Sequence, residues 1–95
     1  MKEINWRAID LNLLVVFNAL VEEKSVSKAA DKLNIGQSAM SHSLSRLRDL
    51  LSDPLFERQG HIMVPSQKAI ELTPVIASIL NQISQQVLRT GTFEP

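Results

Sequence analysis

The chain has 95 residues, of which 44% are hydrophobic, and this suffices for one small folded domain with one protruding element. It contains no cysteine and only two isolated histidines, which excludes disulfides and thiolate metal sites and argues against a zinc site. The formal net charge is zero, which argues against a protein that coats nucleic acid through a general excess of positive charge.

The first predicted helix runs from Leu11 to about Lys24. Asp10 is the expected N-cap, because its carboxylate can accept hydrogen bonds from the free amides at the helix start. Trp6, in the segment before it, either stacks on the last helix or lies on the surface. Apolar residues are so frequent in this helix that it must be covered on more than one side. The residues expected to face the core are Leu13, Leu14, Phe17, Leu20 and Val21.

A second helix is predicted to begin after residue 25, with either Ser25 or Ser27 as its cap and Val26 packed beneath it. Asn34-Ile35-Gly36 then forms a tight turn, because Asn and Gly tolerate turn conformations that most residues resist. Ile35 is expected to fill the angle between this helix and the next. The apolar face of the second helix consists of Ala29, Ala30 and Leu33, and its two small side chains allow another helix to approach closely.

The third helix is expected to run from about Gln37 to about Leu51. It carries four serines although serine is a mediocre helix former. This indicates that the serines have a role other than stabilising the helix. Hydroxyl groups beside Gln, His and Arg side chains suit phosphate oxygens and base edges in a major groove, whereas the alternative is a face that is merely solvated. The expected core residues are Met40, Leu44, Leu47 and Leu51, and the expected outward residues are Ser38, Ser41, His42, Ser45, Arg46 and Asp49.

A β-hairpin is predicted next, because Ser52-Asp53-Pro54 ends the third helix. Its strands are expected over residues 55–58 and 62–64, joined by Gln59-Gly60-His61. Leu55 and Phe56 should be partly buried against the helices, while Arg58, Gln59 and His61 should project. The alternative is a solvated turn with incidental charges, and a single His at a loop tip is usually just solvated.

The last helix is expected to start after its cap Ser66 and to extend to residue 88 or 89. It contains more apolar side chains than one small domain can bury, which predicts pairing with a second copy of the chain; the alternative is packing only on its own domain. Pro74 should kink this helix or mark a short break near Leu72. The residues expected at the dimer interface are Leu72, Ile76, Ile79, Leu80, Ile83 and Val87.

Nearly the whole chain resembles the N-terminal DNA-binding domain of LysR-type transcriptional regulators. The Arg46-Leu47-Arg48 segment followed by Asp-Pro-Leu-Phe is similar to the subgroup that includes nodulation and aromatic-degradation regulators. Two positions depart from the family pattern: Gly36 stands where Ser or Thr often caps the recognition helix, and Ser38 where Pro often lies. The resemblance is carried by Asp10-Leu11-Asn12-Leu13-Leu14, Phe17, Ser25-Val26-Ser27-Lys28-Ala29-Ala30, Leu33, Gln37, Ser41, Leu47 and Asp53-Pro54-Leu55-Phe56-Glu57-Arg58.

This resemblance implies a mainly α fold in three parts. Residues 1–65 would form a winged helix-turn-helix of three helices plus a two-stranded β wing, residues 66–90 a long linker helix for dimerisation, and residues 91–95 the start of a truncated effector-binding domain. No cofactor is expected in this fragment, and a small-molecule inducer is expected for the missing C-terminal domain. The expected partners are double-stranded DNA and a second copy bound through the last helix, with a tetramer considered for the full-length protein.

The expected contacts with DNA follow from the outward face of the third helix and from the family's docking geometry. Residues 25–68 hold six basic and four acidic residues, whereas the flanking parts are slightly acidic. The residues expected to read bases are Gln37, Ser38, Ser41, His42 and Ser45. The residues expected to contact phosphates or to lie on the wing are Ser27, Lys28, Arg46, Arg58 and His61.

The leading hypothesis is therefore a sequence-specific DNA-binding module that binds an interrupted palindrome as a dimer. An alternative is a winged helix that serves protein assembly and does not touch DNA. An enzyme is disfavoured, because the sequence has no carboxylate pair, Ser-His-acid set or glycine-rich phosphate loop. A cytoplasmic protein is expected, since the apolar run from Leu13 to Phe17 is too short to span a bilayer and the N-terminus lacks the layout of a signal peptide.

Overall fold

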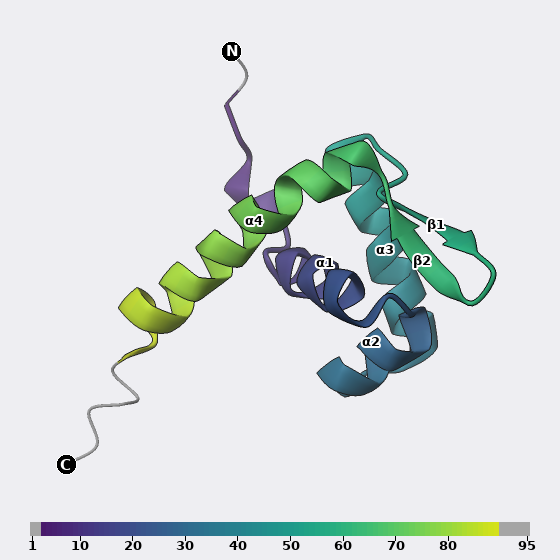
Figure 1. Ribbon diagram of the computed structural model, residues 1–95. Coiled ribbons are helices and arrows are strands. Elements are labelled where there is room, and N and C mark those ends of the chain that lie inside the picture. Colours follow the sequence, from purple (N-terminus) through teal and green to yellow (C-terminus); the bar gives the residue numbers. More distant parts are fainter. Residues whose placement is uncertain (1–2, 90–95) are drawn as a thin grey trace.

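The computed structural model describes residues 3–89 and forms a winged helix-turn-helix followed by a long helix. Figure 1 shows α4 crossing over α1 and leading away from the hairpin, which projects beside α3. The predicted mainly helical fold is confirmed, whereas the predicted start of a further domain at residues 91–95 lies outside the described residues. The elements are a 3₁₀ turn Trp6–Ala8, α1 Asn12–Glu23, α2 Val26–Leu33, α3 Gln37–Leu51, β1 Phe56–Gln59, β2 Ile62–Pro65, α4 Gln67–Gln82 and a π-helical segment Ile83–Val87.

One hydrophobic core joins the helices to the hairpin. The rings of Phe17 on α1 and Phe56 on β1 pack with their centroids 5.5 Å apart, and both side chains are buried. Leu55 and Phe56 are fully buried, more deeply than the sequence predicted, because the hairpin starts inside the core. The predicted core residues that are buried are Leu13, Phe17, Leu20, Met40, Leu44 and Leu47, while Leu14, Val21, Val26, Leu33 and Leu51 are partly buried against them.

The predicted cap is confirmed at the start of α2 but not at the start of α1. α1 begins at Asn12, one residue later than expected, and its N-cap is Leu11 rather than the predicted Asp10. The Asp10 carboxylate still accepts a hydrogen bond from the Asn12 amide at 2.9 Å. Ser25 rather than Ser27 is the cap of α2, since its hydroxyl accepts from the Lys28 amide at 3.1 Å. Gly36 precedes α3 in an extended conformation and supplies no side-chain cap.

Two details of the loops differ from the sequence predictions, and the position of Trp6 decides between two alternatives that the sequence left open. Ile35 is 38% exposed, so it fills the angle between α2 and α3 only in part. The hairpin loop is one residue shorter than expected, because Gln59 pairs with Ile62 and leaves only Gly60 and His61 unpaired. Gly60 has a φ of +65°, which glycine adopts without a Cβ clash. Trp6 is 66% exposed and therefore lies on the surface.

The α4 helix continues through Pro74, so the break considered near Leu72 does not occur. Proline removes one backbone hydrogen bond. Buried side chains on both sides of it, Ala69 before and Ile76 after, hold the two halves of the helix on the same core. None of the helices within residues 3–89 is long and apolar enough to cross a membrane.

The predicted dimer seam on α4 is divided by the fold. Ile76 is buried in the chain's own core, and Leu72 and Leu80 pack partly against it, because this face of α4 covers α1. The prediction that Ile76 faces a second copy is therefore wrong. The large apolar residues from α4 to Leu88 that are exposed are Ile70, Val75, Ile79, Val87 and Leu88, and Ile83 is partly exposed.

Candidate nucleic-acid interface

A polar groove lies between the start of α2, the start of α3 and the hairpin. Its volume is about 370 Å³, and residues from all three segments line it. The fold thus brings together residues that are distant in the sequence but were predicted to share one function. The predicted site residues in this groove are Ser27, Gln37, Ser41, Arg58 and His61, and Ser25, Val26, Ile62 and Met63 complete its lining.

The outward face of α3 continues from this groove. Met40, Leu44 and Leu47 are buried on the opposite face, and this fixes which side of the helix is presented to solvent. The three remaining predicted base-reading residues, Ser38, His42 and Ser45, are exposed outside the groove. We call the exposed surface formed by Gln37, Ser38, Ser41, His42 and Ser45 the α3 ridge.

Two lysines on α2 have different surroundings. Lys32 forms ion pairs with Glu22 and, at 3.7 Å, with Glu23 on α1. The hydrogen bond with Glu22 raises the pKa of Lys32 and lowers the pKa of Glu22. Lys28 is exposed beside the groove, and within residues 3–89 its ammonium group makes no ion pair.

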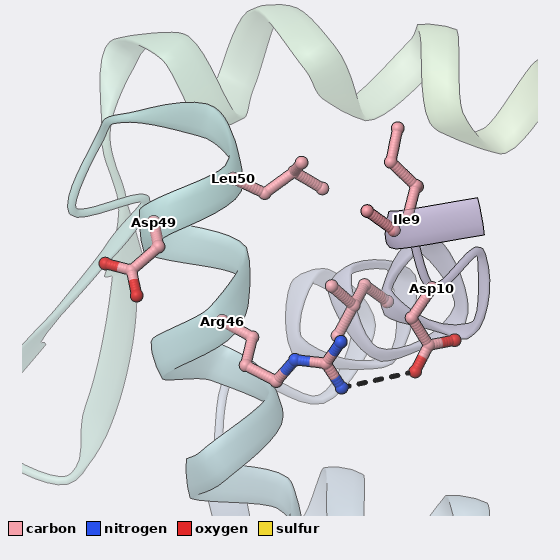
Figure 2. A pocket seen from close by; sticks show the side chains of 7 residues that line it. Ile9, Asp10, Arg46, Asp49 and Leu50 are labelled. Atoms are coloured by element: carbon pink, nitrogen blue, oxygen red, sulfur yellow. Dashed lines mark hydrogen bonds and ion pairs between the residues drawn. The ribbon is translucent and has the colours of Figure 1, made fainter. Parts of the chain in front are cut away.

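The structure does not bring Arg46 to the groove. Its guanidinium Nη1 lies 3.4 Å from the Asp10 carboxylate on the side of α3 that faces the start of α1. Both side chains line a separate hollow with a volume of about 290 Å³. Figure 2 shows them directed toward each other. A phosphate contact by Arg46 therefore requires its side chain to leave Asp10.

Sequence reasoning missed two side chains that hold the hairpin in place. Arg48 donates through Nε to the Pro54 carbonyl and through Nη2 to the Phe56 carbonyl, each at 2.8 Å. Asp53 Oδ2 accepts from the Leu55 amide at 2.8 Å and from the Ser66 hydroxyl at 2.7 Å. The only signal in the sequence was the Arg-Leu-Arg segment followed by Asp-Pro-Leu-Phe.

Leu55 shows why these hydrogen bonds are needed. Its φ is +63°, a left-handed conformation that is costly for a residue with a branched side chain, yet its side chain is fully buried. The Asp53 carboxylate binds the Leu55 amide, and the Leu55 carbonyl accepts from the Ser66 amide at 2.7 Å. These contacts fix the tight turn that aims the hairpin along α3.

The pH dependence of stability should report on Asp53. Hydrogen bonds from Ser66 and Leu55 hold the pKa of this carboxyl below its usual value. A group whose pKa is lower in the folded state stabilises the fold above its ordinary pKa of about 4, and this contribution is lost as the pH falls through the lower folded value. We expect Asp53→Asn to lower the free energy of unfolding at pH 7 and to make its decline in acid shallower.

Urea unfolding followed by circular dichroism between pH 2.5 and 7 would check this expectation. Asp31→Asn is the control, since Asp31 lies at an exposed position of α2. Parallel pH profiles for Asp53→Asn and the unmodified chain would show that Asp53 does not stabilise the turn.

The helix pair α2–α3, the exposed α3 ridge and the adjacent hairpin define a winged helix-turn-helix DNA-binding domain. The family model for bacterial regulatory helix-turn-helix proteins of the lysR family matches residues 11–74. The chain belongs to this family.

Curated relatives support this membership along almost the whole chain. The HTH-type transcriptional activator NagR from a Ralstonia species is 44% identical over 97% of the chain, and nodulation protein D 2 from Sinorhizobium fredii is 36% identical over 97%. These confirm the predicted likeness to the subgroup that includes nodulation regulators. The chain spans only 31% and 30% of the lengths of these two relatives.

Solved structures agree with the fold. A probable transcriptional regulator from Pseudomonas aeruginosa superposes with a TM-score of 0.80 at 46% identity, with 84% of this chain and 27% of that chain covered. The DNA-binding domain of BenM, in complex with its benA site 1 DNA, superposes with a TM-score of 0.79 at 30% identity, with 90% and 96% covered. The chain is thus a LysR-type DNA-binding domain of transcriptional regulators, and the prediction that it is not an enzyme is confirmed.

Proposed function

We propose that this domain binds an interrupted palindrome with the α3 ridge in the major groove and the hairpin against the flanking backbone. The observation that carries the proposal is the continuous polar surface from the groove to the α3 ridge, which combines short hydroxyls, an amide and an imidazole. Such groups can reach base edges, which carry the sequence information in a major groove. The BenM domain, whose fold is similar, was solved with DNA.

Contacts with phosphates would come from residues that flank this surface. Ser27 and Arg58 line the groove on the side of α2 and of the hairpin, and Lys28 is exposed beside it. His61 lies at the hairpin tip, where it would approach the minor groove or the backbone next to it. Such contacts position the protein without reading the sequence.

We further propose that two copies bind together through α4. A second copy could cover the exposed apolar residues Val75 and Ile79 on α4 and Val87 at the end of the π-helical segment. Two-fold symmetry would place two α3 helices in successive major grooves about 34–36 Å apart, or a multiple of this. By resemblance to the family, the DNA palindrome would have T and A at its ends. The same resemblance implies a sensor domain in the longer protein, which would bind an inducer in the cytoplasm.

Selection of bound sequences from a random oligonucleotide pool tests this function. We expect an enriched interrupted palindrome, and Ser41→Ala is expected to reduce discrimination at one position of each half-site by about 1–3 kcal/mol if Ser41 contacts a base. Ser43→Ala is a matched control, because it is the same substitution on α3 at a partly buried position outside the α3 ridge. Enrichment of no sequence would contradict the proposal, and a stable dimer without DNA binding would favour a protein-assembly module.

The two lysines of α2 provide a second test of the orientation on DNA. Lys28→Ala is expected to weaken binding to all sequences and to reduce the magnitude of the salt dependence by about one counterion per domain. Lys32→Ala removes the same charge from the same helix, but Lys32 is already paired with Glu22 and Glu23, so we expect a smaller effect. Fluorescence anisotropy across a salt series measures both. Equal effects of the two variants would contradict the proposed docking face.

A further inference from the structure

The Asp10–Arg46 pair connects the start of α1 with the edge of the α3 ridge. One Arg46 nitrogen lies 3.4 Å from Asp10 Oδ2, and both side chains are more than one third exposed. A single long contact of this kind is weaker than a two-pronged arginine–carboxylate pair. Another anion, such as a DNA phosphate, could therefore displace Asp10 from Arg46.

The two partners differ in how firmly the structure holds them. Asp10 is fixed from the other side, because its Oδ1 accepts from the Asn12 amide at 2.9 Å and its carbonyl accepts from the Leu13 amide at 3.0 Å. Arg46 has a long side chain that lies along an open hollow of about 290 Å³, and Figure 2 shows its guanidinium directed toward Asp10. The carboxylate is thus the fixed partner and the guanidinium the one that can move.

The position of Arg46 makes this contact relevant to DNA. Arg46 directly follows Ser45 and lies one helical turn after His42, so it borders the α3 ridge. The chain carries no net charge, so the individual cations near the α3 ridge matter for its attraction to DNA. Holding one of them at a carboxylate removes a notable share of the non-specific attraction to phosphates.

We propose that Asp10 is a specificity-determining residue, which lowers the affinity for DNA of the wrong sequence by holding the Arg46 guanidinium away from phosphates. The proposal rests on the proposed docking of α3 in the major groove. When bases match, the contacts of the α3 ridge seat the helix fully and Arg46 moves from Asp10 to a phosphate. When they do not match, Arg46 stays with Asp10 and the complex lacks that contact.

Asp10→Asn separates this role from the start of α1. Asparagine also accepts hydrogen bonds at a helix start, so the fold should be kept while the charge that holds Arg46 is lost. We expect binding to a random-sequence duplex to strengthen about two- to fivefold, the range of an exposed ion pair, and its salt dependence to steepen. Binding to the selected palindrome should strengthen less, so the ratio of specific to non-specific affinity should fall.

Two further variants distinguish the tether from a simple change of charge. Asp49→Asn removes an equal charge one turn from Arg46, but Asp49 makes no ion pair within residues 3–89 and points away from the pair in Figure 2. The gain in affinity for random-sequence DNA from Asp10→Asn should exceed the gain from Asp49→Asn. In the Asp10→Asn, Arg46→Gln double variant, this gain should vanish when binding is compared with that of Arg46→Gln alone. An equal gain in both single variants, or a gain that persists without Arg46, would overturn the proposal while leaving DNA binding intact. Failure of the unmodified chain to bind any DNA would instead refute the proposed function and this inference together.

Discussion

Replacing Phe56 by alanine is expected to lower the free energy of unfolding by about 3–5 kcal/mol, the range measured for large-to-small changes at buried aromatic positions. Phe56 is 1% exposed and packs against Phe17, which itself is fully buried. The truncation removes both the buried area of the side chain and its contact with the ring of Phe17. The hairpin holds the Cβ of residue 56 in place, so the surrounding core cannot easily close the cavity that is left. Small domains have total stabilities of about 5–15 kcal/mol, so this loss would remove a large share of the free energy of unfolding.

Thermal and urea unfolding of the Phe56→Ala variant would measure this loss. Ile62→Ala is the matched control, since Ile62 is an apolar residue on the neighbouring strand that is 49% exposed. Its removal should change stability by less than about 0.5 kcal/mol. If Phe56→Ala unfolded at the same urea concentration as the Ile62→Ala control, the hairpin would not be part of the core as described.

The helix-turn-helix could be predicted from the sequence because its signals are local. The spacing of Met40, Leu44 and Leu47 fixes the buried side of α3 whatever packs against it, so the outward face follows by exclusion. Asn34 at the end of α2 has a φ of +59°, which agrees with the conformational tolerance used to place the turn.

The partners of α4 could not be predicted in the same way. The spacing of Leu72, Ile76 and Ile79 is the same whether the apolar face packs on the chain's own α1 or on a second copy, because helical periodicity encodes a face and not its occupant. Ile76 is 4% exposed within the single chain. Only the three-dimensional arrangement, in which α4 crosses over α1 (Figure 1), decides the question for this residue.

The roles of the two arginines on α3 also depend on tertiary structure. Two residues apart on a helix means about 200° of rotation, so Arg46 and Arg48 point to opposite sides. The sequence showed both as basic residues on the predicted DNA-reading helix. It did not show that Arg46 would pair with Asp10, or that Arg48 would donate hydrogen bonds to two backbone carbonyls. Every residue has a backbone carbonyl, so the sequence does not indicate which of them accepts a hydrogen bond from Arg48. This is why the structural role of Arg48 was missed.

Arg48→Met should separate these two roles. It keeps most of the side-chain stem but removes two charged hydrogen bonds, to the Pro54 and Phe56 carbonyls, at a partly buried position. Hydrogen bonds to charged groups contribute about 1.5–3 kcal/mol each, so we expect the free energy of unfolding to fall by about 2–3 kcal/mol after allowing for the exposed part of the guanidinium. The hairpin would then be less well aligned with α3, and DNA affinity should fall for all sequences alike.

Arg46→Met is the matched control on the same helix. It removes only an exposed ion pair, so stability should change by less than about 1 kcal/mol, while binding to the selected palindrome should weaken through the lost phosphate contact. The expected results are therefore different: Arg48→Met mainly lowers the midpoint of urea unfolding, and Arg46→Met mainly lowers DNA affinity. In Arg46→Met the salt dependence of DNA binding should also decrease, by about one counterion per domain. If both variants lost the same stability and the same affinity, the two arginines would share one role, and the assignment of Arg48 to the hairpin and Arg46 to DNA would be wrong.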